Sequence, residues 1–474
     1  MIARFPCWAA AFLLSFTVAA GALPKITIAK NSRGFTTENG QPFSPFGLTY
    51  YRPGTGWAPQ LWKKFDPAAT RQDFAKMKEL GVNCVRVFLT FGSFYNAAGT
   101  LDETGLAKFD QFLAIAESAG IYVHPTGPDH WEGLPGWMHG NRIGDVEALG
   151  ALEQFWKLFA ARYRNRPVIF AYDLRNEPEV GWETEALQRR WNEWVAAHYG
   201  SLEKAARAWG NSNILEGVRL KVPQPRNVST RELLDFQHCR EDLADEWTQR
   251  QTVAIKSVDS NALVTVGLIQ WSVPSVLPRL QHYSGFRPER QARFLDFLEF
   301  HFYPLENGAY EYASAASAER NLAYFSSVLR EVARPGKPVV LAEFGWYGGG
   351  KPSFDRNRHP AATQQQQAEW CRSLVAVSAG QATGWLNWGL YDQPEATDVS
   401  QLTGLLQADG QIKAWGKEFQ KLSLEIRRGL PAAALPAEPK LDWDACLTSL
   451  AAEKQFREEF LGAFKKIRSA ERER

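Results

Sequence analysis

Eight short runs rich in valine, isoleucine and aromatic residues recur along the chain, and stretches with the apolar spacing of helices lie between them. Parallel strands that are buried on both faces have this composition. Eight strands that alternate with helices predict a closed (β/α)8 barrel, the TIM-barrel architecture of the α/β class. An open doubly wound sheet is the alternative, and the lack of a Gly-rich phosphate loop after the first run weakens it. The expected strands are Phe46–Tyr51, Val82–Leu89, Ile121–Thr126, Val168–Leu174, Ala262–Leu268, Phe297–Tyr303, Val339–Phe344 and Gly384–Tyr391.

The barrel is expected to span residues 23–428 and to begin with a small β-hairpin. Lys25–Ile28 and Gly34–Thr37 have the composition of short strands, and Asn39 followed by Gly40 is a hairpin turn signal. We expect this hairpin to close the floor of the barrel.

The connection between the fourth and fifth expected strands is far longer than a normal barrel unit. It contains several helical stretches over about residues 182–259. Because it starts where barrel loops choose substrates, we hypothesise that it narrows one end of a cleft, with a peripheral stabilising role as the alternative. Its tryptophans motivate this hypothesis: Trp182, Trp191, Trp194 and Trp209. After the barrel, residues 429–440 indicate a linker, and residues 441–474 indicate a charged helical tail on the barrel's outside.

Residues 1–22 have the features of a secretory signal peptide, since Arg4 precedes an apolar stretch that ends in small residues. The stretch falls short of the roughly 20 residues that a membrane span needs, and an uncleaved anchor is the alternative. The mature protein is therefore expected to be secreted or periplasmic. Cys84 is expected to be a buried thiol, and one disulfide among Cys239, Cys371 and Cys446 stays open.

The charge of the chain is nearly balanced, with Lys+Arg 54 against Asp+Glu 52. This balance gives no electrostatic basis for binding nucleic acid or an anionic membrane surface. The 18 tryptophans are numerous, and tryptophan faces stack well on the apolar faces of sugar rings. The excess fits a carbohydrate binder, while the alternative is that large aromatics fill a large core.

Two short strings each place a glutamate at the end of a β-rich run. Two carboxylates at strand ends, far apart in the sequence, suit acid/base and nucleophilic work on a glycosidic bond. Either string alone is a weak signal, since most chance matches to Asn-Glu-Pro are starts of helices or turns. Their order and strand context strengthen the hypothesis. The strings are Leu174-Arg175-Asn176-Glu177-Pro178 and Leu341-Ala342-Glu343-Phe344-Gly345.

Alternate residues of a barrel strand point inward, and function gathers at the carboxyl ends of the strands. On this basis we expect Glu343 to share an inward face with Val339 and Leu341. The polar and aromatic members of the inward sets fall late in their strands. The corresponding residues of the second, sixth and eighth strands are Arg86, Glu299, His301, Tyr303 and Trp388.

On these motifs the chain resembles the clan of retaining glycoside hydrolases built on a TIM barrel, and is most similar to glycoside hydrolase family five, the cellulases and mannanases. The resemblance covers about residues 43–422 in architecture. It implies that Glu177 is the acid/base on strand four and that Glu343 is the nucleophile on strand seven. Within the long connection, His198–Glu203 and Arg207–Gly210 resemble a segment of the β-galactosidases of glycoside hydrolase family forty-two.

Three residues are expected to support the two glutamates. Arg86 resembles the strand-two arginine of the clan, and its charge would keep Glu343 ionised. Tyr303 would donate a hydrogen bond to the same carboxylate from strand six. His301 would orient either Glu177 or a sugar hydroxyl.

Four more residues are expected to contact the sugar. Asn176 would reach the 2-hydroxyl, a contact that strengthens in the transition state, and Trp388 would form a platform under the reacting sugar. His124 and Trp131 lie in or after the third strand, near other His, Asp and Trp residues. A metal site there is the alternative, but the spacings match no standard ligand motif. This strand has no aspartate before His124, a departure from many cellulases that leaves the substrate open.

These observations predict a retaining β-glycosidase that acts on β-linked glucan or mannan and uses neither a cofactor nor a metal. A β-galactosidase-like exo-glycosidase is the enzymatic alternative, favoured by the long connection. A non-catalytic carbohydrate-binding barrel is the alternative of a different class, and the presence of both glutamates argues against it.

Overall fold

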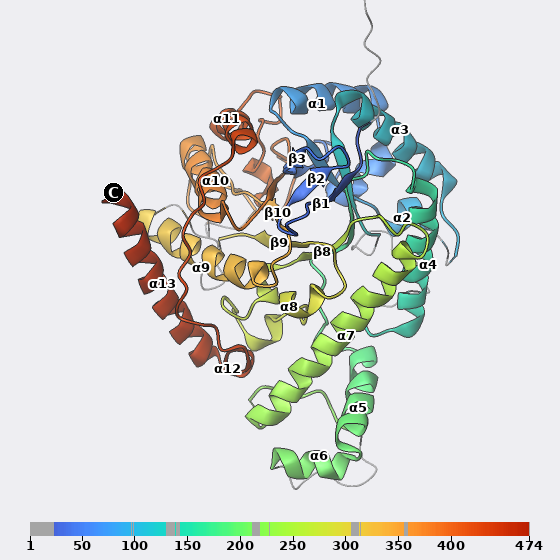
Figure 1. The fold of residues 1–474 in the computed structure, drawn as a ribbon, viewed down its shortest axis with the longest axis vertical. Helices are drawn as coiled ribbons and strands as arrows, with labels where there is room; N and C mark the ends of the chain where they lie inside the picture. Colours follow the sequence, from blue (N-terminus) through green and yellow to red (C-terminus); the bar gives the residue numbers. More distant parts are fainter. Residues whose placement is uncertain are drawn as a thin grey trace, which may run out of the picture.

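Eight parallel strands close into a barrel in the computed structural model, which confirms the expected architecture (Figure 1). The structure describes residues 23–473 except 96, 98, 129–137, 139–142, 211–218, 227, 305–311, 313 and 355–358. Around the barrel the strands follow the order β10-β11-β4-β5-β6-β7-β8-β9. Their bounds are β4 Phe46–Thr49, β5 Cys84–Phe88, β6 Tyr122–Thr126, β7 Tyr172–Asn176, β8 Val264–Leu268, β9 Leu298–Phe302, β10 Val339–Phe344 and β11 Gly384–Trp388.

Long helices surround the strands, and side-chain caps begin most of them. Asp66, for example, accepts from the backbone amides of Ala68 and Ala69, which satisfies donors that the first turn leaves unpaired. The long helices are α1 Pro67–Glu79, α3 Glu103–Ala119, α4 Val146–Tyr163, α7 Thr230–Lys256, α9 Ala315–Ala333, α10 Gln364–Ser378 and α11 Ala414–Arg428. Short helices are α2 Phe91–Phe94, α8 Pro288–Gln291 and the 3-10 turns Ala58–Lys64, Gln270–Ser272, Leu280–His282 and Val399–Leu402.

The fourth barrel strand begins later than expected, at Tyr172 instead of Val168. The carbonyl of Val168 and the amide of Phe170 still pair with Val123 of β6. The next residue that pairs with β6 as part of a strand is Asp173, so the ladder is interrupted between the two. The apolar run therefore predicts the pairing correctly but places the start of the strand too early.

The barrel floor is closed by a three-stranded antiparallel sheet, where the sequence predicts a two-stranded hairpin. Its strands are β1 Ile26–Ile28, β2 Phe35–Thr37 and β3 Pro42–Phe43. The Asn39–Gly40 turn joins β2 to β3, and Gly40 adopts a positive φ of 80°. The ring of Phe35 meets the rings of Phe170 and Phe297 edge-on, each at a centroid distance of 5.1 Å.

The long connection after β7 holds α5 Glu185–Tyr199, α6 Leu202–Trp209 and α7, and α5 and α6 extend away from the barrel (Figure 1). Its tryptophans form the core of this projection, where Trp191 stacks on both Trp194 and Trp209 at 5.6 Å. The later part of α7 is a barrel helix, since α7 packs on α4 and Arg250 pairs with Glu153.

Two helices follow residues 429–440 and lie on the outside of the barrel, as α12 Trp443–Thr448 and α13 Leu450–Arg472. Helix α13 packs against α9 (Figure 1). The ring of Phe460 on α13 is buried, and the guanidinium carbon of Arg330 on α9 lies 4.9 Å from its centroid. Helix α12 contacts α7, where the Gln237 side chain donates to the Leu447 carbonyl. The limits of separate domains remain predictions.

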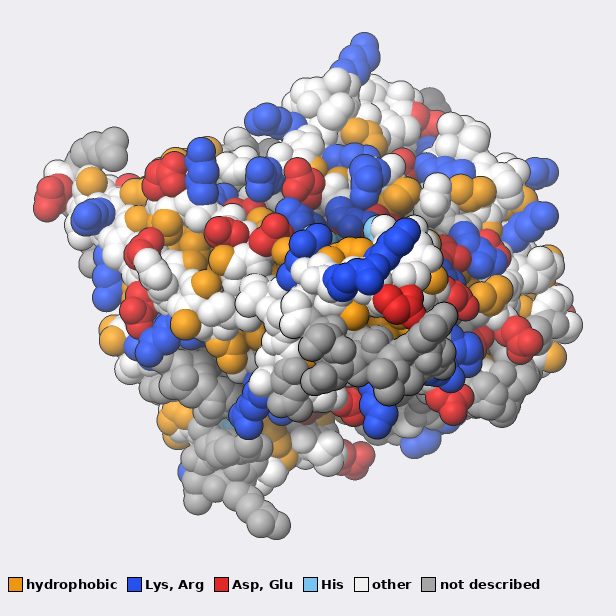
Figure 2. All heavy atoms as spheres, turned by 90° about the horizontal axis from the view of Figure 1, so that it is seen from below, with side chains coloured by type: hydrophobic (Ala, Val, Ile, Leu, Met, Phe, Trp, Pro, Cys, Tyr) orange, Lys and Arg blue, Asp and Glu red, His pale blue; other side chains and the backbone are white. Residues whose placement is uncertain are grey.

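Cys84, Cys239, Cys371 and Cys446 are all buried and free, so no disulfide joins cysteines in the described part of the chain. Across the described helices, none combines the length and the apolar character that a membrane crossing requires. The expected signal peptide lies outside the described residues, and secretion remains a prediction. Acidic and basic side chains of the described residues are interspersed on the face shown in Figure 2.

We expect Phe35→Ala to lower the free energy of unfolding by about 3–5 kcal/mol, because it empties a buried aromatic contact in the floor of the barrel. Urea unfolding followed by circular dichroism would measure the change. Lys30→Ala, in the exposed turn before β2, is the control and should change stability by about 0.5 kcal/mol or less. Equal stability of the two variants would show that the floor sheet does not support the barrel.

Candidate active site

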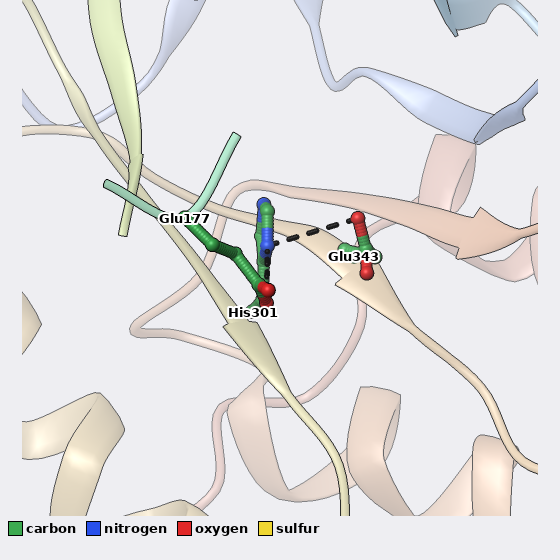
Figure 3. A group of neighbouring side chains, drawn as sticks. All are labelled: Glu177, His301 and Glu343. Atoms are coloured by element: carbon green, nitrogen blue, oxygen red, sulfur yellow. Dashed lines mark hydrogen bonds and ion pairs between the residues drawn. The ribbon is translucent and has the colours of Figure 1, made fainter. Parts of the chain in front are cut away.

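Glu177 and Glu343 approach one another at the carboxyl ends of the strands, with His301 between them (Figure 3). His301 Nδ1 lies 3.0 Å from Glu177 Oε1 and 3.7 Å from Glu343 Oε2. One oxygen of each carboxylate lies within 4.8 Å of the other. The barrel thus brings together two carboxyl groups that are far apart in the sequence.

A bulge in β10 turns Glu343 into the barrel. Val339 and Leu341, which were expected to point inward, pack in the apolar cluster shared with the outer helices, while Val340 and Ala342 pack inside with Phe35. In the pairing of β10 with β9, Leu341 lies opposite Phe300 and Glu343 lies opposite His301. Two residues of β10 therefore span the distance that one residue of β9 spans. The expected alternation is therefore wrong for this strand, and the extra residue at the bulge restores the inward position of Glu343.

A second bulge lies in β7, beside the other glutamate. In the pairing of β7 with β8, Asp173 lies opposite Thr265 and Asn176 lies opposite Gly267. Three residues of β7 therefore advance over the distance that two residues of β8 span. Both residues of β7 consequently contact Arg86 inside the barrel. Glu177 follows with a φ of 47°, a conformation that costs energy for a residue with a side chain and that is frequent at functional sites.

Arg86 of β5 is fully buried and is compensated by Asp173, a residue that the sequence reasoning missed. Asp173 Oδ2 accepts from Arg86 Nη2 at 2.8 Å and from the Thr126 hydroxyl at 2.9 Å. Its Oδ1 accepts from the backbone amides of Gly267 at 2.8 Å and Arg175 at 3.1 Å. Burial alone would raise the pKa of Asp173, but Arg86 and the nearby histidines lower it. The sequence signal that could have identified Asp173 is the presence of a polar residue within the apolar run of β7.

The Glu343 carboxylate receives two hydrogen bonds, from the residues expected to support it. Arg86 Nη1 donates to Oε2 at 3.1 Å and the Tyr303 hydroxyl donates to Oε1 at 2.8 Å. Burial raises the pKa of Glu343, and Glu177 adds to this effect, while His301, Arg86 and Tyr303 oppose it. The two donors favour the ionised form of this carboxylate.

Glu177 has a different environment. Burial raises the pKa of its carboxyl to about 7, and only the more distant charge of Arg86 opposes the shift. The imidazole of His301 contacts this carboxyl through Nδ1, and burial lowers the pKa of His301 to about 4. Near neutral pH, His301 is therefore uncharged and does not force Glu177 to ionise. The two glutamates thus differ in the charge that their surroundings favour.

His124 does not reach the cavity, so its expected sugar contact is not supported. The side chain has no exposed surface, its Nδ1 contacts the Ala171 carbonyl at 2.9 Å, and its Nε2 contacts Glu299 at 2.8 Å. Both ring nitrogens are therefore occupied inside the barrel, in the layer that holds Asp173. Strand alternation correctly predicts that Glu299 points inward, but it cannot tell that its partner is His124.

A cavity of about 310 Å³ opens above the two glutamates. Asn176, Tyr303 and Trp388 line it as expected, and Trp388 Nε1 donates to the Ser400 hydroxyl at 2.8 Å. Several wall residues belong to loops that no motif marks. They are Trp57, Trp271, Trp346, Phe354, Asp398 and Ser400.

Trp131 and its neighbours Asp129, His130, Trp137 and His139 lie outside the described residues, so their expected sugar contacts remain predictions. No described residue of the connection 182–259 lines the cavity. Its tryptophans pack against one another, which removes the main reason for expecting the connection to wall the cleft.

Among the described residues, Glu177, His301 and Glu343 are close enough to share a metal ion through one atom each. The trio already pairs internally, and the positive charge of Arg86 beside Glu343 disfavours a second cation. That no metal takes part remains a prediction.

Comparison with known proteins identifies the family of this chain. The model of the family described as Cellulase (glycosyl hydrolase family 5) matches residues 36–393. β-Galactosidase YesZ of Bacillus subtilis (strain 168) is 22% identical over 398 residues, which cover 77% of this chain and 53% of that protein. Mannan endo-1,4-β-mannosidase F of Aspergillus clavatus is 26% identical over 201 residues, which cover 36% and 44%. The chain thus spans about half the length of the curated relatives it matches.

A solved structure of similar length has the same fold. GH5_18 of Streptomyces cattleya, in complex with GlcNAc, superposes with a TM-score of 0.62 at 18% identity over 91% of this chain and 92% of that one. The family model covers well over half of the residues and both glutamates. The chain therefore belongs to the cellulase family, glycosyl hydrolase family 5.

Proposed function

We propose that this protein hydrolyses β-linked O-glycosidic bonds with retention of anomeric configuration. The observation that carries the proposal is the approach of Glu177 and Glu343 to within 4.8 Å between their nearest oxygens. Retaining enzymes hold their two carboxyl groups about 5–5.5 Å apart, whereas inverting enzymes leave room for a water at about 6.5–9.5 Å. The short separation supports attack by one carboxylate directly on the anomeric carbon.

In this mechanism Glu343 is the nucleophile and Glu177 is the acid/base. The hydrogen bonds from Arg86 and Tyr303 keep Glu343 ionised and fix its direction of attack. The raised pKa of Glu177 keeps a proton available for the leaving oxygen. After the glycosyl-enzyme forms, the same carboxylate removes a proton from water, and the water then displaces Glu343.

The cavity walls supply the sugar contacts. Asn176 Oδ1 accepts from Arg86, which can only donate, so the amide NH₂ of Asn176 is left to face the sugar. The ring of Trp388 is held by Ser400 and provides an apolar surface beneath the reacting sugar.

We propose a β-linked glucan or mannan as the substrate class. The family assignment and the similarity to a mannan endo-1,4-β-mannosidase support it. A β-galactosidase-like exo-glycosidase is the second candidate, favoured by the similarity to β-galactosidase YesZ over most of this chain. A barrel that only binds carbohydrate is disfavoured, because both carboxyl groups stand at catalytic spacing. A screen of aryl β-glucosides, β-mannosides and β-galactosides would separate these candidates.

The two glutamates should respond differently to removal. Glu177→Ala should lower kcat/KM on an unactivated β-linked oligosaccharide by about 10²–10⁴-fold, because the proton donor is lost, and should matter least for aryl glycosides with good leaving groups. Glu343→Ala should lower activity at least as much, because no covalent intermediate can form. Added azide should restore turnover of Glu343→Ala on an activated substrate, with an α-glycosyl azide as the product detected by NMR.

Glu79→Ala, an exposed glutamate at the end of α1, is the matched control and should keep wild-type activity. Near-normal hydrolysis of an unactivated oligosaccharide by both active-site variants would reject the assignment. A β-glycosyl azide from Glu343→Ala would reject the role of that residue as nucleophile.

The pH profile should report the proton on Glu177. This proton is present below a pKa of about 7 and is lost as the pH rises, so kcat/KM on an unactivated substrate should fall above about pH 7. Glu177→Gln cannot titrate, so its hydrolysis of an aryl glycoside with a good leaving group should lose this alkaline fall. The wild type on the same aryl substrate is the control. An unchanged alkaline limb in the variant would assign the titration to another group.

A further inference from the structure

The long connection after β7 carries a buried cation, Arg240 of α7, which has no exposed surface. Among the described residues, its guanidinium donates to two backbone carbonyls and one side-chain amide. We propose that Arg240 is a positioning residue for Glu177, because it holds the loop that follows this glutamate and a second loop of the cavity wall. The inference rests on the proposed function and gives the long connection a part in it.

The guanidinium fixes the chain just after the proposed acid/base. Its Nε and Nη2 donate to the Val180 carbonyl at 3.0 and 2.6 Å. Val180 is buried and follows Glu177 by three residues. Hydrogen bonds from a charged donor are shorter and stronger than those between neutral groups. One side chain of the long connection therefore restrains the loop that carries Glu177.

The same guanidinium reaches a second loop, between β8 and β9. Nη2 also donates to the Tyr283 carbonyl at 2.5 Å. The next residue, Ser284, accepts from the Val180 amide at 2.8 Å, and its own amide donates to the Trp271 carbonyl at 3.2 Å. Trp271 and Glu177 both line the cavity above the two glutamates. Arg240 thus closes a connected unit that contains the proposed acid/base and part of the cavity wall.

Aromatic rings fix the orientation of the guanidinium. Its carbon lies 5.1 Å from the ring centroid of Trp182 and 6.0 Å from that of Tyr283. Such contacts suit a planar cation and restrict its movement. Burial lowers the pKa of Arg240 to about 10, and the nearby carboxylates of Glu179 and Glu241 oppose the shift, so the side chain remains charged at neutral pH.

Glu177 requires restraint because its backbone is strained. Its φ is 47°, and its amide donates to the Gly267 carbonyl at 2.8 Å. A conformation of this kind persists only where the surrounding structure enforces it. The bond to Gly267 holds the chain at Glu177 itself, and Arg240 holds it at Val180. A misplacement of a reacting group by about 1 Å can cost about 100-fold in rate, so loss of the second restraint should be visible in catalysis.

The test compares 2,4-dinitrophenyl and phenyl β-glycosides of the sugar on which the wild type is most active. Dinitrophenolate departs without a proton, whereas the departure of phenol benefits from the proton of Glu177. The ratio of the two kcat/KM values therefore reports the placement of the proton donor, while a loss of folded enzyme lowers both values equally. Arg240→Met should raise the ratio of dinitrophenyl to phenyl glycoside by about 10-fold or more. Arg240→Lys keeps a charged donor without the guanidinium fork and should raise it by only about 3-fold.

Glu177→Ala sets the upper limit, since it removes the proton donor itself. Arg250→Met, on the same helix, is the matched control, because it removes the ion pair with Glu153 and should keep the wild-type ratio. Melting temperatures would show which variants are folded, and Arg240→Lys suffices if Arg240→Met is not. A wild-type ratio in the folded Arg240 variants would overturn the inference and leave the proposed function intact. No hydrolysis of any glycoside by the wild type would overturn both.

Discussion

The buried guanidinium of Arg86 is the constraint on which the rest of the site depends. A positive charge without exposed surface must be paired with opposite charge, or its desolvation would destabilise the fold. Asp173 and Glu343 supply the opposite charges, and Asn176 supplies a further acceptor. Three strands are thereby tied to one cation. Both β7, which ends just before Glu177, and β10, which carries Glu343, contain a bulge.

The space around this cation is equally constrained. A Cβ on Gly267 would lie 3.1 Å from both Arg86 Nη2 and His301 Nε2, so with a side chain there both groups would have to shift slightly. Gly267 also accepts the Glu177 amide through its carbonyl, at the point where the chain adopts a positive φ. One small residue on β8 thus permits the close approach of the cation, the histidine and the strained glutamate.

Charge asymmetry follows from this arrangement. Glu343 contacts the cation and a phenol, whereas Glu177 contacts a histidine that burial keeps neutral. Two carboxyl groups so close together would repel one another if both were ionised. The neighbouring residues favour the charged form of Glu343 and the protonated form of Glu177, which avoids this repulsion. A nucleophile and a proton donor need these two different protonation states.

The sequence by itself determined the eight strands, the barrel and the two glutamates, because period, composition and strand-end motifs are local properties. It also determined Arg86, His301, Tyr303 and Trp388 as inward-facing partners. Only the tertiary structure decided the rest. Strand alternation failed in β10 because a bulge is defined by the register of two neighbouring strands, which no single strand encodes. The tertiary structure likewise decided the burial of His124 and the role of Asp173. It also decided which loop residues line the cavity above the two glutamates. Each depends on which distant segments meet, and that is set by closure of the barrel and not by the residues beside them in the chain.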